Sequence, residues 1–148
     1  FHLVLVGAKK NAFAEVEYEI ARLDLVERVH ILGYVPNSDM AAFYRHARAL
    51  IMPTFFGPTN IPPLEAMAVG CPVAISGIYG IPEQVGDAAL LFDPNSEKQI
   101  ANAMLRLATE DDLCVKLAHE GRNVSRRWGI REFSDRLKLI VESCIEEH

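Results

Sequence analysis

One carboxylate stands alone in the least charged part of the sequence. Between Arg48 and Glu83 there are 34 residues, and Glu65 is the only charged one. The chain-wide share of charged residues, 24%, would place about eight charges there. Such depletion is typical of a buried segment, and a buried carboxylate is costly unless it accepts hydrogen bonds. We therefore expect either a structural donor or a hydroxyl group of a ligand to satisfy Glu65.

The residues before Glu65 form the entrance to a predicted helix. Asn60 suits the N-cap, and Pro62 and Pro63 suit the first turn, where backbone amides are unpaired anyway. Gly57 has no side chain to block close approach, so the helix start could hold an anion. A phosphate site beside a carboxylate that accepts hydrogen bonds from hydroxyl groups would suit a nucleotide sugar. The alternative is that Asn60 only caps the helix and Glu65 only accepts from a backbone amide.

The elements that must position this segment are predicted to be alternating strands and helices. Short apolar runs without polar alternation are typical of strands covered on both faces; they are residues 2–7, 29–33, 48–53, 72–76 and 88–92. Helical spacing of apolar residues lies between them, most clearly over 12–25. This order predicts an α/β fold with a Rossmann-like, doubly wound parallel sheet of about five strands. In such sheets ligands bind beyond the carboxyl ends of the strands, and Asn60 follows the third run.

The last third of the sequence is predicted to be a helical extension of the same domain. Three helices are expected here. The first starts at Ser96, which suits an N-cap, the second runs over about 111–127, and the third over about 131–145. Apolar residues at helical spacing in the third helix are expected to face inward; they are Phe133, Leu137, Ile140, Val141 and Cys144.

The composition excludes several classes of protein. The net charge of −5 argues against a nucleic-acid binder, which needs a basic surface. The three cysteines are scattered and the five histidines lack ligand spacing, so we expect no metal site and no disulfide framework. Free thiols and the lack of a long apolar run favour a cytoplasmic protein. A peripheral place at the inner membrane face stays open.

Residues 50–94 resemble the C-terminal half of a family 4 retaining glycosyltransferase, which has the two-domain GT-B architecture. The runs that carry the resemblance are 53–76 and 85–94, and it extends back to 29–35 and the first strand. It implies a domain that binds a nucleotide sugar, such as a UDP, GDP or ADP sugar, and no cofactor or metal. The sugar would pass to an acceptor with its anomeric configuration kept.

The resemblance also implies roles for residues of the 57–65 segment. Glu65 aligns with the second glutamate of the family's two-glutamate motif, which accepts hydrogen bonds from the ribose hydroxyls. The first glutamate, which contacts the donor sugar, would fall at Gly57, so this chain departs from the family there. Asn60 and Ile61, after Thr59 of the same loop, align with the segment whose backbone amides face the phosphates.

Two further places are candidates for contact with the substrate. By resemblance, Gly33, Tyr34 and Val35 form the loop that lines the base. Glu83 could contact the sugar or the acceptor and is the one candidate catalytic residue. A glutamate after a proline, however, also commonly starts a helical turn.

The same resemblance implies that residues 1–148 are a C-terminal nucleotide-sugar-binding domain that lacks its first strand and the N-terminal acceptor domain. We therefore expect the fragment to be inactive alone. The absent strand would lie beside residues 2–7, so the edges of that strand and of 48–53 could support self-association. The alternative functions are a non-catalytic paralogue that binds a nucleotide or a protein, and a sugar-nucleotide epimerase of GT-B architecture.

Overall fold

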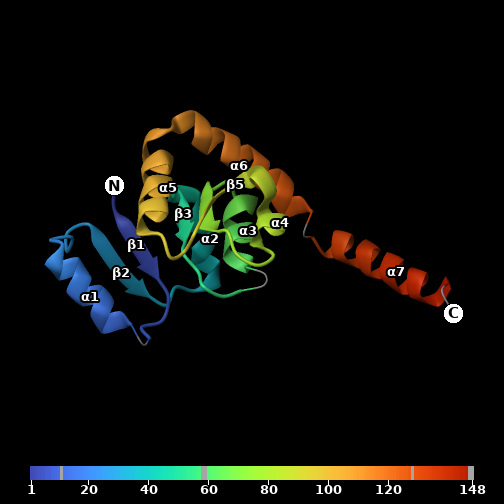
Figure 1. The fold of residues 1–148 in the computed structure, drawn as a ribbon, viewed down its shortest axis with the longest axis horizontal. Helices are drawn as coiled ribbons and strands as arrows, with labels where there is room; N and C mark the ends of the chain where they lie inside the picture. The colour runs from blue at the N-terminus through green and yellow to red at the C-terminus, as the bar shows by residue number, and fades with distance from the viewer. Residues whose placement is uncertain (11, 58–59, 128, 147–148) are drawn as a thin grey trace. The chain divides into compact units, whose positions relative to one another are not determined.

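The structure is a computed structural model that describes residues 1–10, 12–57, 60–127 and 129–146. The chain divides into two compact units, Phe1–Met40 and Ala41–His148, and each is described by itself. Figure 1 labels the helices and strands of both units.

The first unit is built on two parallel strands. They are β1 (Leu3–Val6) and β2 (Val29–Gly33), joined through α1 (Phe13–Arg22). The register runs from Leu3 opposite Val29 to Val6 opposite Gly33, with a shift between Leu5 and Val6. A further helix, α2 (Asn37–His46), begins in this unit and ends in the second.

The second unit is a three-stranded parallel sheet with helices around it. Its strands are β3 (Leu50–Met52), β4 (Val73–Ser76) and β5 (Ala89–Phe92), in the order β3-β4-β5. The helices are α3 (Ile61–Ala68), α4 (Ile81–Val85), η1 (Gly86–Ala88, a 3₁₀ turn), α5 (Glu97–Thr109), α6 (Asp111–Arg126) and α7 (Ile130–Glu146). All four residues of β4 are buried, as expected of a central strand.

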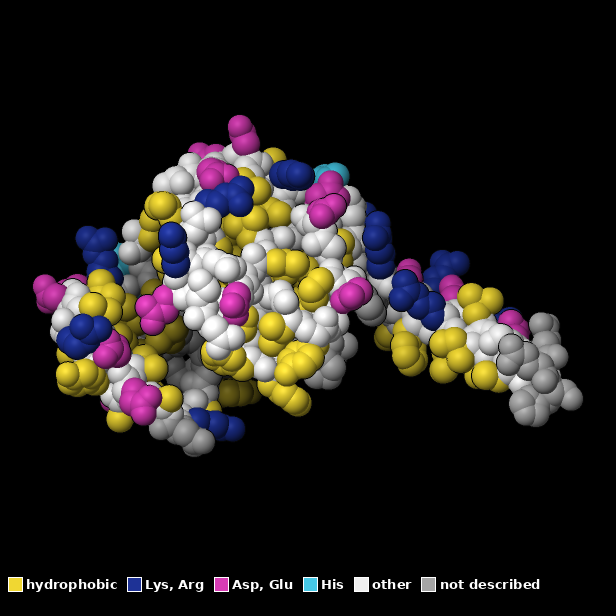
Figure 2. All heavy atoms as spheres, in the orientation of Figure 1, with side chains coloured by type: hydrophobic (Ala, Val, Ile, Leu, Met, Phe, Trp, Pro, Cys, Tyr) yellow, Lys and Arg dark blue, Asp and Glu magenta, His cyan; other side chains and the backbone are white. Residues whose placement is uncertain are grey.

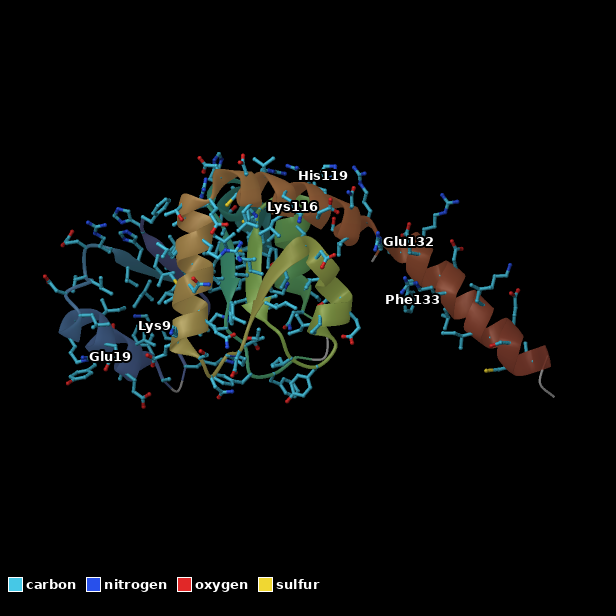
Figure 3. All side chains as sticks on the ribbon, turned by 45° about the horizontal axis from the view of Figure 1, so that its top comes forward. Lys9, Glu19, Lys116, His119, Glu132 and Phe133 are labelled. Atoms are coloured by element: carbon cyan, nitrogen blue, oxygen red, sulfur yellow. The ribbon has the colours of Figure 1, made fainter. Side chains whose placement is uncertain are left out.

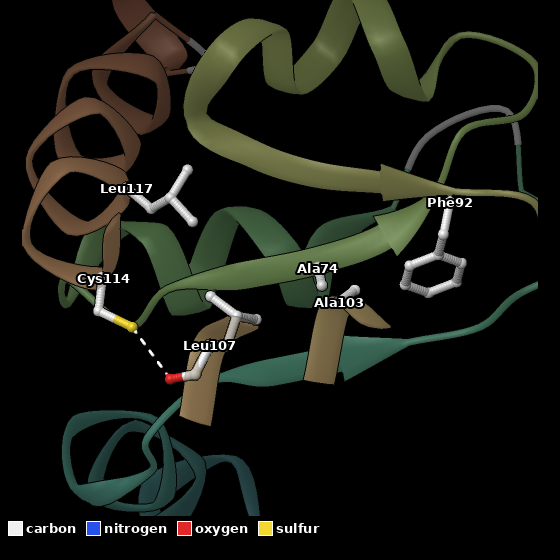
Figure 4. Close-up of a cluster of buried hydrophobic side chains, with 6 residues drawn as sticks. All are labelled: Ala74, Phe92, Ala103, Leu107, Cys114 and Leu117. Atoms are coloured by element: carbon white, nitrogen blue, oxygen red, sulfur yellow. Dashed lines mark hydrogen bonds between the residues drawn. The ribbon is translucent and has the colours of Figure 1, made fainter. Parts of the chain in front are cut away.

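The core of the second unit joins β4 and β5 to α5 and α6. Its buried side chains are Ala74, Phe92, Ala103, Leu107, Cys114 and Leu117 (Figure 4). The Cys114 thiol donates to the Leu107 carbonyl at 3.2 Å, and burial raises the pKa of that thiol. Ser96 caps α5 as predicted, because its Oγ accepts from the Gln99 amide at 3.3 Å.

The α/β class, the five strands and their parallel direction are confirmed. The described strands form one sheet of two strands and one of three. β1 and β3 are each an edge of their own sheet, as expected for residues 2–7 and 48–53.

The predicted inward face of the last helix is also wrong. Phe133, Leu137, Ile140 and Val141 are 48% to 68% exposed, and Cys144 is exposed. The physical reason is that no part of the described chain covers them. Figure 2 shows hydrophobic side chains gathered along α7, and Figure 3 shows Phe133 on this helix. Among the residues that the structure describes, we find no helix with the length and the apolar character that a membrane span requires.

Candidate functional site

The candidate site lies in the second unit, where β3 ends and α3 begins. The loop between them is tied to the end of β4, because the Thr54 amide donates to the Ser76 Oγ at 2.8 Å. The Thr54 hydroxyl donates to the Phe56 carbonyl at 2.6 Å, which closes a short turn. The loop is therefore held at the carboxyl ends of two neighbouring parallel strands, where the fold class places its ligands.

A buried glutamine side chain holds the residue that starts α3. The backbone N–H of Asn60 donates to the Gln84 Oε1 at 3.3 Å, and the Gln84 Nε2 donates to the backbone carbonyl of Asn60 at 3.1 Å. Gln84 comes from α4 and is 5% exposed. Sequence reasoning missed this residue, because a glutamine inside a short helix carries no signal of such a contact.

This pairing changes how an anion could be held at the start of α3. The backbone N–H of Asn60 already donates to Gln84, and Pro62 and Pro63 have no N–H group. Ile61 therefore supplies the only backbone donor in the first turn, together with the positive end of the helix dipole. The sequence-based prediction of a phosphate site rests here on fewer amides than a helix start usually offers.

The Asn60 side chain does not cap α3, although Asn60 occupies the N-cap position. An N-cap side chain accepts from the second or third amide of the helix, and both positions here are prolines. The side chain is instead packed beside Gly57, where an added Cβ would lie 2.7 Å from the Asn60 Oδ1. Asn60 is 8% exposed, and its Nδ2 has no hydrogen-bond partner among the described residues.

Glu65 is exposed, so the expectation that it is buried is wrong. It lies on a solvent-facing side of α3, whereas the apolar residues that surround it in sequence, Ala66 and Met67, are fully buried. The low number of charged residues predicts burial of the segment on average, but it does not predict the burial of Glu65 itself. The carboxylate nevertheless has a structural donor, because the Tyr44 hydroxyl lies 3.4 Å from the Glu65 Oε2.

Tyr44 differs from Glu65 in being 7% exposed. Its burial, and then the negative charge of Glu65, raise the pKa of the Tyr44 phenol to about 12. The phenol is therefore neutral and donates to the carboxylate at physiological pH. The other oxygen of Glu65, Oε1, accepts no hydrogen bond from any residue that the structure describes. One oxygen of Glu65 thus accepts a hydrogen bond from Tyr44, and the other can accept a hydrogen bond from a hydroxyl group of a ligand.

The remaining predicted site residues are described within their own units. Gly33 ends β2 with φ of +71°, Tyr34 is 77% exposed and Val35 is half-buried, all in the first unit. Glu83 is exposed in the first turn of α4, where a glutamate suits the helix dipole. Thr59 lies outside the described residues.

The first unit has a hollow of its own after β1. It has a volume of about 440 Å³ and includes Gly7, Lys9, Lys10 and Phe13 in its lining. The Lys9 ammonium lies 4.3 Å from the centre of the Phe13 ring, a cation–π distance, and Figure 3 shows Lys9 near the start of α1. No group of three or more potential metal ligands occurs among the described residues.

Parallel strands alternating with helices define a Rossmann-like α/β protein. Residues 1–124 match the family described as glycosyl transferases group 1. The match covers more than half of the chain, and the chain therefore belongs to this family.

Curated relatives agree with this membership. The O-antigen chain mannosyltransferase B of Escherichia coli is 40% identical over 93 residues, which are 59% of this chain and 24% of that protein. The 2-deoxystreptamine glucosyltransferase of Streptomyces kanamyceticus is 30% identical over 122 residues, which are 81% of this chain and 30% of that protein. The chain thus spans about a quarter to a third of the length of these relatives.

Solved structures share the fold at lower identity. HepE from Anabaena, in a complex with UDP-glucose, has a TM-score of 0.83 at 21% identity, over 96% of this chain and 41% of that one. Sucrose-phosphate synthase from Thermosynechococcus elongatus has a TM-score of 0.83 at 23% identity, over 99% of this chain and 39% of that one. At these identities the likeness shows the fold alone.

Proposed function

We propose that this chain is the donor-binding domain of a retaining glycosyltransferase, which transfers a sugar from a nucleotide sugar to an acceptor. Family membership supports the reaction class, and the relatives named above are a mannosyltransferase and a glucosyltransferase. HepE, which shares the fold, was solved with UDP-glucose. The observation that carries the proposal is the exposed carboxylate of Glu65 beside the start of α3.

The proposed division of work follows from the groups at this site. Glu65 accepts hydrogen bonds from the ribose hydroxyls of the nucleotide through Oε1. The Ile61 amide and the α3 dipole face the phosphates and stabilise the charge that develops on the leaving diphosphate. The loop Gly33, Tyr34 and Val35 lines the base. The donor is a substrate, and the proposal needs no metal or other cofactor.

We further propose that the first strand of this domain and the acceptor domain belong to other parts of the same protein. The relatives are three to four times as long as their matched segments, which leaves ample length for both. Transfer then needs the complete protein, and this chain alone is inactive. The proposed location is cytoplasmic, with attachment to the inner membrane face as the alternative.

Calorimetric titration of UDP, GDP and ADP tests the proposal. The chain is measured alone and preceded by the upstream part of its own protein. We expect at least one nucleotide to bind, and Glu65→Ala to weaken that binding about 10- to 100-fold, because hydrogen bonds to charged groups contribute about 1.5–3 kcal/mol. Glu97→Ala, which removes an exposed carboxylate from α5, is the matched control and should bind normally. The proposal would be contradicted if none of the nucleotides bound to the chain, alone or with its upstream part. It would also be contradicted if Glu65→Ala and Glu97→Ala lost the same nucleotide affinity.

A second candidate function rests on the contact between Gly57 and Asn60. The family's first glutamate is absent, and the space beside position 57 is filled by the Asn60 side chain. A domain of this kind could bind a nucleotide without transferring a sugar. In the full-length protein, tight nucleotide binding with neither donor hydrolysis nor transfer would favour this non-catalytic function.

A further inference from the structure

A buried tyrosine reaches the proposed ribose-binding carboxylate from another helix. Of the residues in α2, all of which the structure describes, Tyr44 alone is buried. Its hydroxyl lies 3.4 Å from the Oε2 of Glu65, 21 residues further along the chain on α3. A buried phenol usually finds a hydrogen-bond partner for its hydroxyl. Here that partner is an exposed side chain, so the hydrogen bond joins the protein interior to the candidate site.

The direction of this hydrogen bond is fixed by chemistry. An ionised carboxylate is only an acceptor, whereas a neutral phenol can donate. Burial and the charge of Glu65 raise the pKa of Tyr44 to about 12, so the phenol keeps its proton at physiological pH. The distance of 3.4 Å is long for O–H···O. Contacts in active sites without ligand are often long and tighten when the ligand binds.

The contact matters because the side chain of a glutamate on an exposed helix face has several rotamers open to it. A ligand that binds such a side chain must order it, and this ordering lowers the affinity. A hydrogen bond to Oε2 removes part of that cost in advance and leaves Oε1 for the ligand. We propose that Tyr44 is a positioning residue that holds Glu65 for the ribose hydroxyls, an inference that rests on the proposed function.

The test compares two nucleotides that differ only in the groups that Glu65 would bind. Tyr44→Phe is titrated with UDP, GDP or ADP, whichever binds best, and with the 2′,3′-dideoxy form of the same nucleotide. The protein is the chain preceded by its own upstream part. We expect the ribonucleotide to bind about 3- to 10-fold more weakly, the range expected from the cost of ordering one side chain, and the dideoxy form to bind unchanged.

Tyr18→Phe is the matched control, because Tyr18 lies on α1 and is 66% exposed. It should leave both affinities unchanged. A role of Tyr44 in packing alone would weaken both nucleotides equally, and this result would overturn the inference. Normal binding of both by Tyr44→Phe, with weakened binding by Glu65→Ala, would overturn the inference and leave the proposed function standing. No binding of any nucleotide by the unmodified protein would overturn both.

Glu65→Asp provides a second test in case Tyr44→Phe does not fold. The shorter side chain keeps the charge but moves the carboxylate away from the Tyr44 hydroxyl. We expect this variant to lose most of its preference for the ribonucleotide over the dideoxy form. A full preference in Glu65→Asp would overturn the inference, because the carboxylate would then work without the tyrosine contact.

Discussion

The start of α3 is shaped by two prolines that remove hydrogen-bond donors. Without N–H groups at Pro62 and Pro63, the Asn60 side chain has nothing to cap, and it packs beside Gly57 instead. Gly57 itself has φ of +134°, a conformation that favours glycine. The departure from the family's first glutamate is therefore tied to two local features, the backbone angle at Gly57 and the neighbouring side chain.

We predict that Gly57→Ala lowers the free energy of unfolding by about 1–3 kcal/mol, because it combines an unfavourable φ with a clash against Asn60. Gly7→Ala is the matched control, since Gly7 has φ of +143° but no atom within 4 Å of the added Cβ. Urea unfolding should show a larger loss for Gly57→Ala, and Asn60→Gly in the same chain should restore part of it. Equal losses in the two alanine variants would contradict the proposed clash.

At the scale of elements, α3 and α6 pack closely because α6 has a glycine at their contact. A Cβ at Gly121 would lie 3.0 Å from the Met67 Cγ and 3.2 Å from its Cβ. Met67 is fully buried, so it has little room to move. The position of α3, and with it that of Glu65, therefore depends on this glycine.

We predict that Gly121→Ala destabilises the chain by about 1–3 kcal/mol through overpacking. Elsewhere in a helix the same change stabilises by about 1 kcal/mol, because alanine is the better helix former. Lys116→Ala, at an exposed position of α6, should change the unfolding free energy by less than about 0.5 kcal/mol. A more stable Gly121→Ala variant in urea unfolding would show that the two helices do not touch there.

The elements were largely predictable from the sequence, but the contacts between them were not. The apolar runs 29–33 and 72–76 match β2 and β4 closely, and Ser96 caps α5, because both signals are local. The pairs Tyr44–Glu65 and Asn60–Gln84 join residues more than 20 positions apart, so no local pattern shows them. The prediction that the Asn60 side chain caps α3 is wrong, because Pro62 and Pro63 lack the N–H groups that a capping side chain would bind.

At the scale of the whole molecule, the exposed apolar face of α7 is the main departure from expectation. An amphipathic helix with an uncovered apolar side favours association. The edges of β1 and β3 are a second possible cause, because unpaired strand edges also bind other chains. Removal of α7 separates these two causes.

We predict that a chain ending at Gly129 unfolds with a free energy within about 0.5 kcal/mol of that of the full chain, because the apolar side chains of α7 are exposed. Sedimentation velocity should show less self-association for the shorter chain. If the shorter chain and the full chain associate equally, the strand edges and not α7 are the cause of the self-association. A large loss of stability would show that α7 packs against the rest of the chain.

The central claim is that Glu65 binds the ribose of a nucleotide, and a crystal structure of the full-length protein with its best-binding nucleotide tests it most directly. We expect a ribose hydroxyl within hydrogen-bond distance of the Glu65 Oε1, about 2.5–3.0 Å, with the Tyr44 hydroxyl still beside Oε2. A ribose bound elsewhere, with Glu65 in contact with solvent only, would contradict the account.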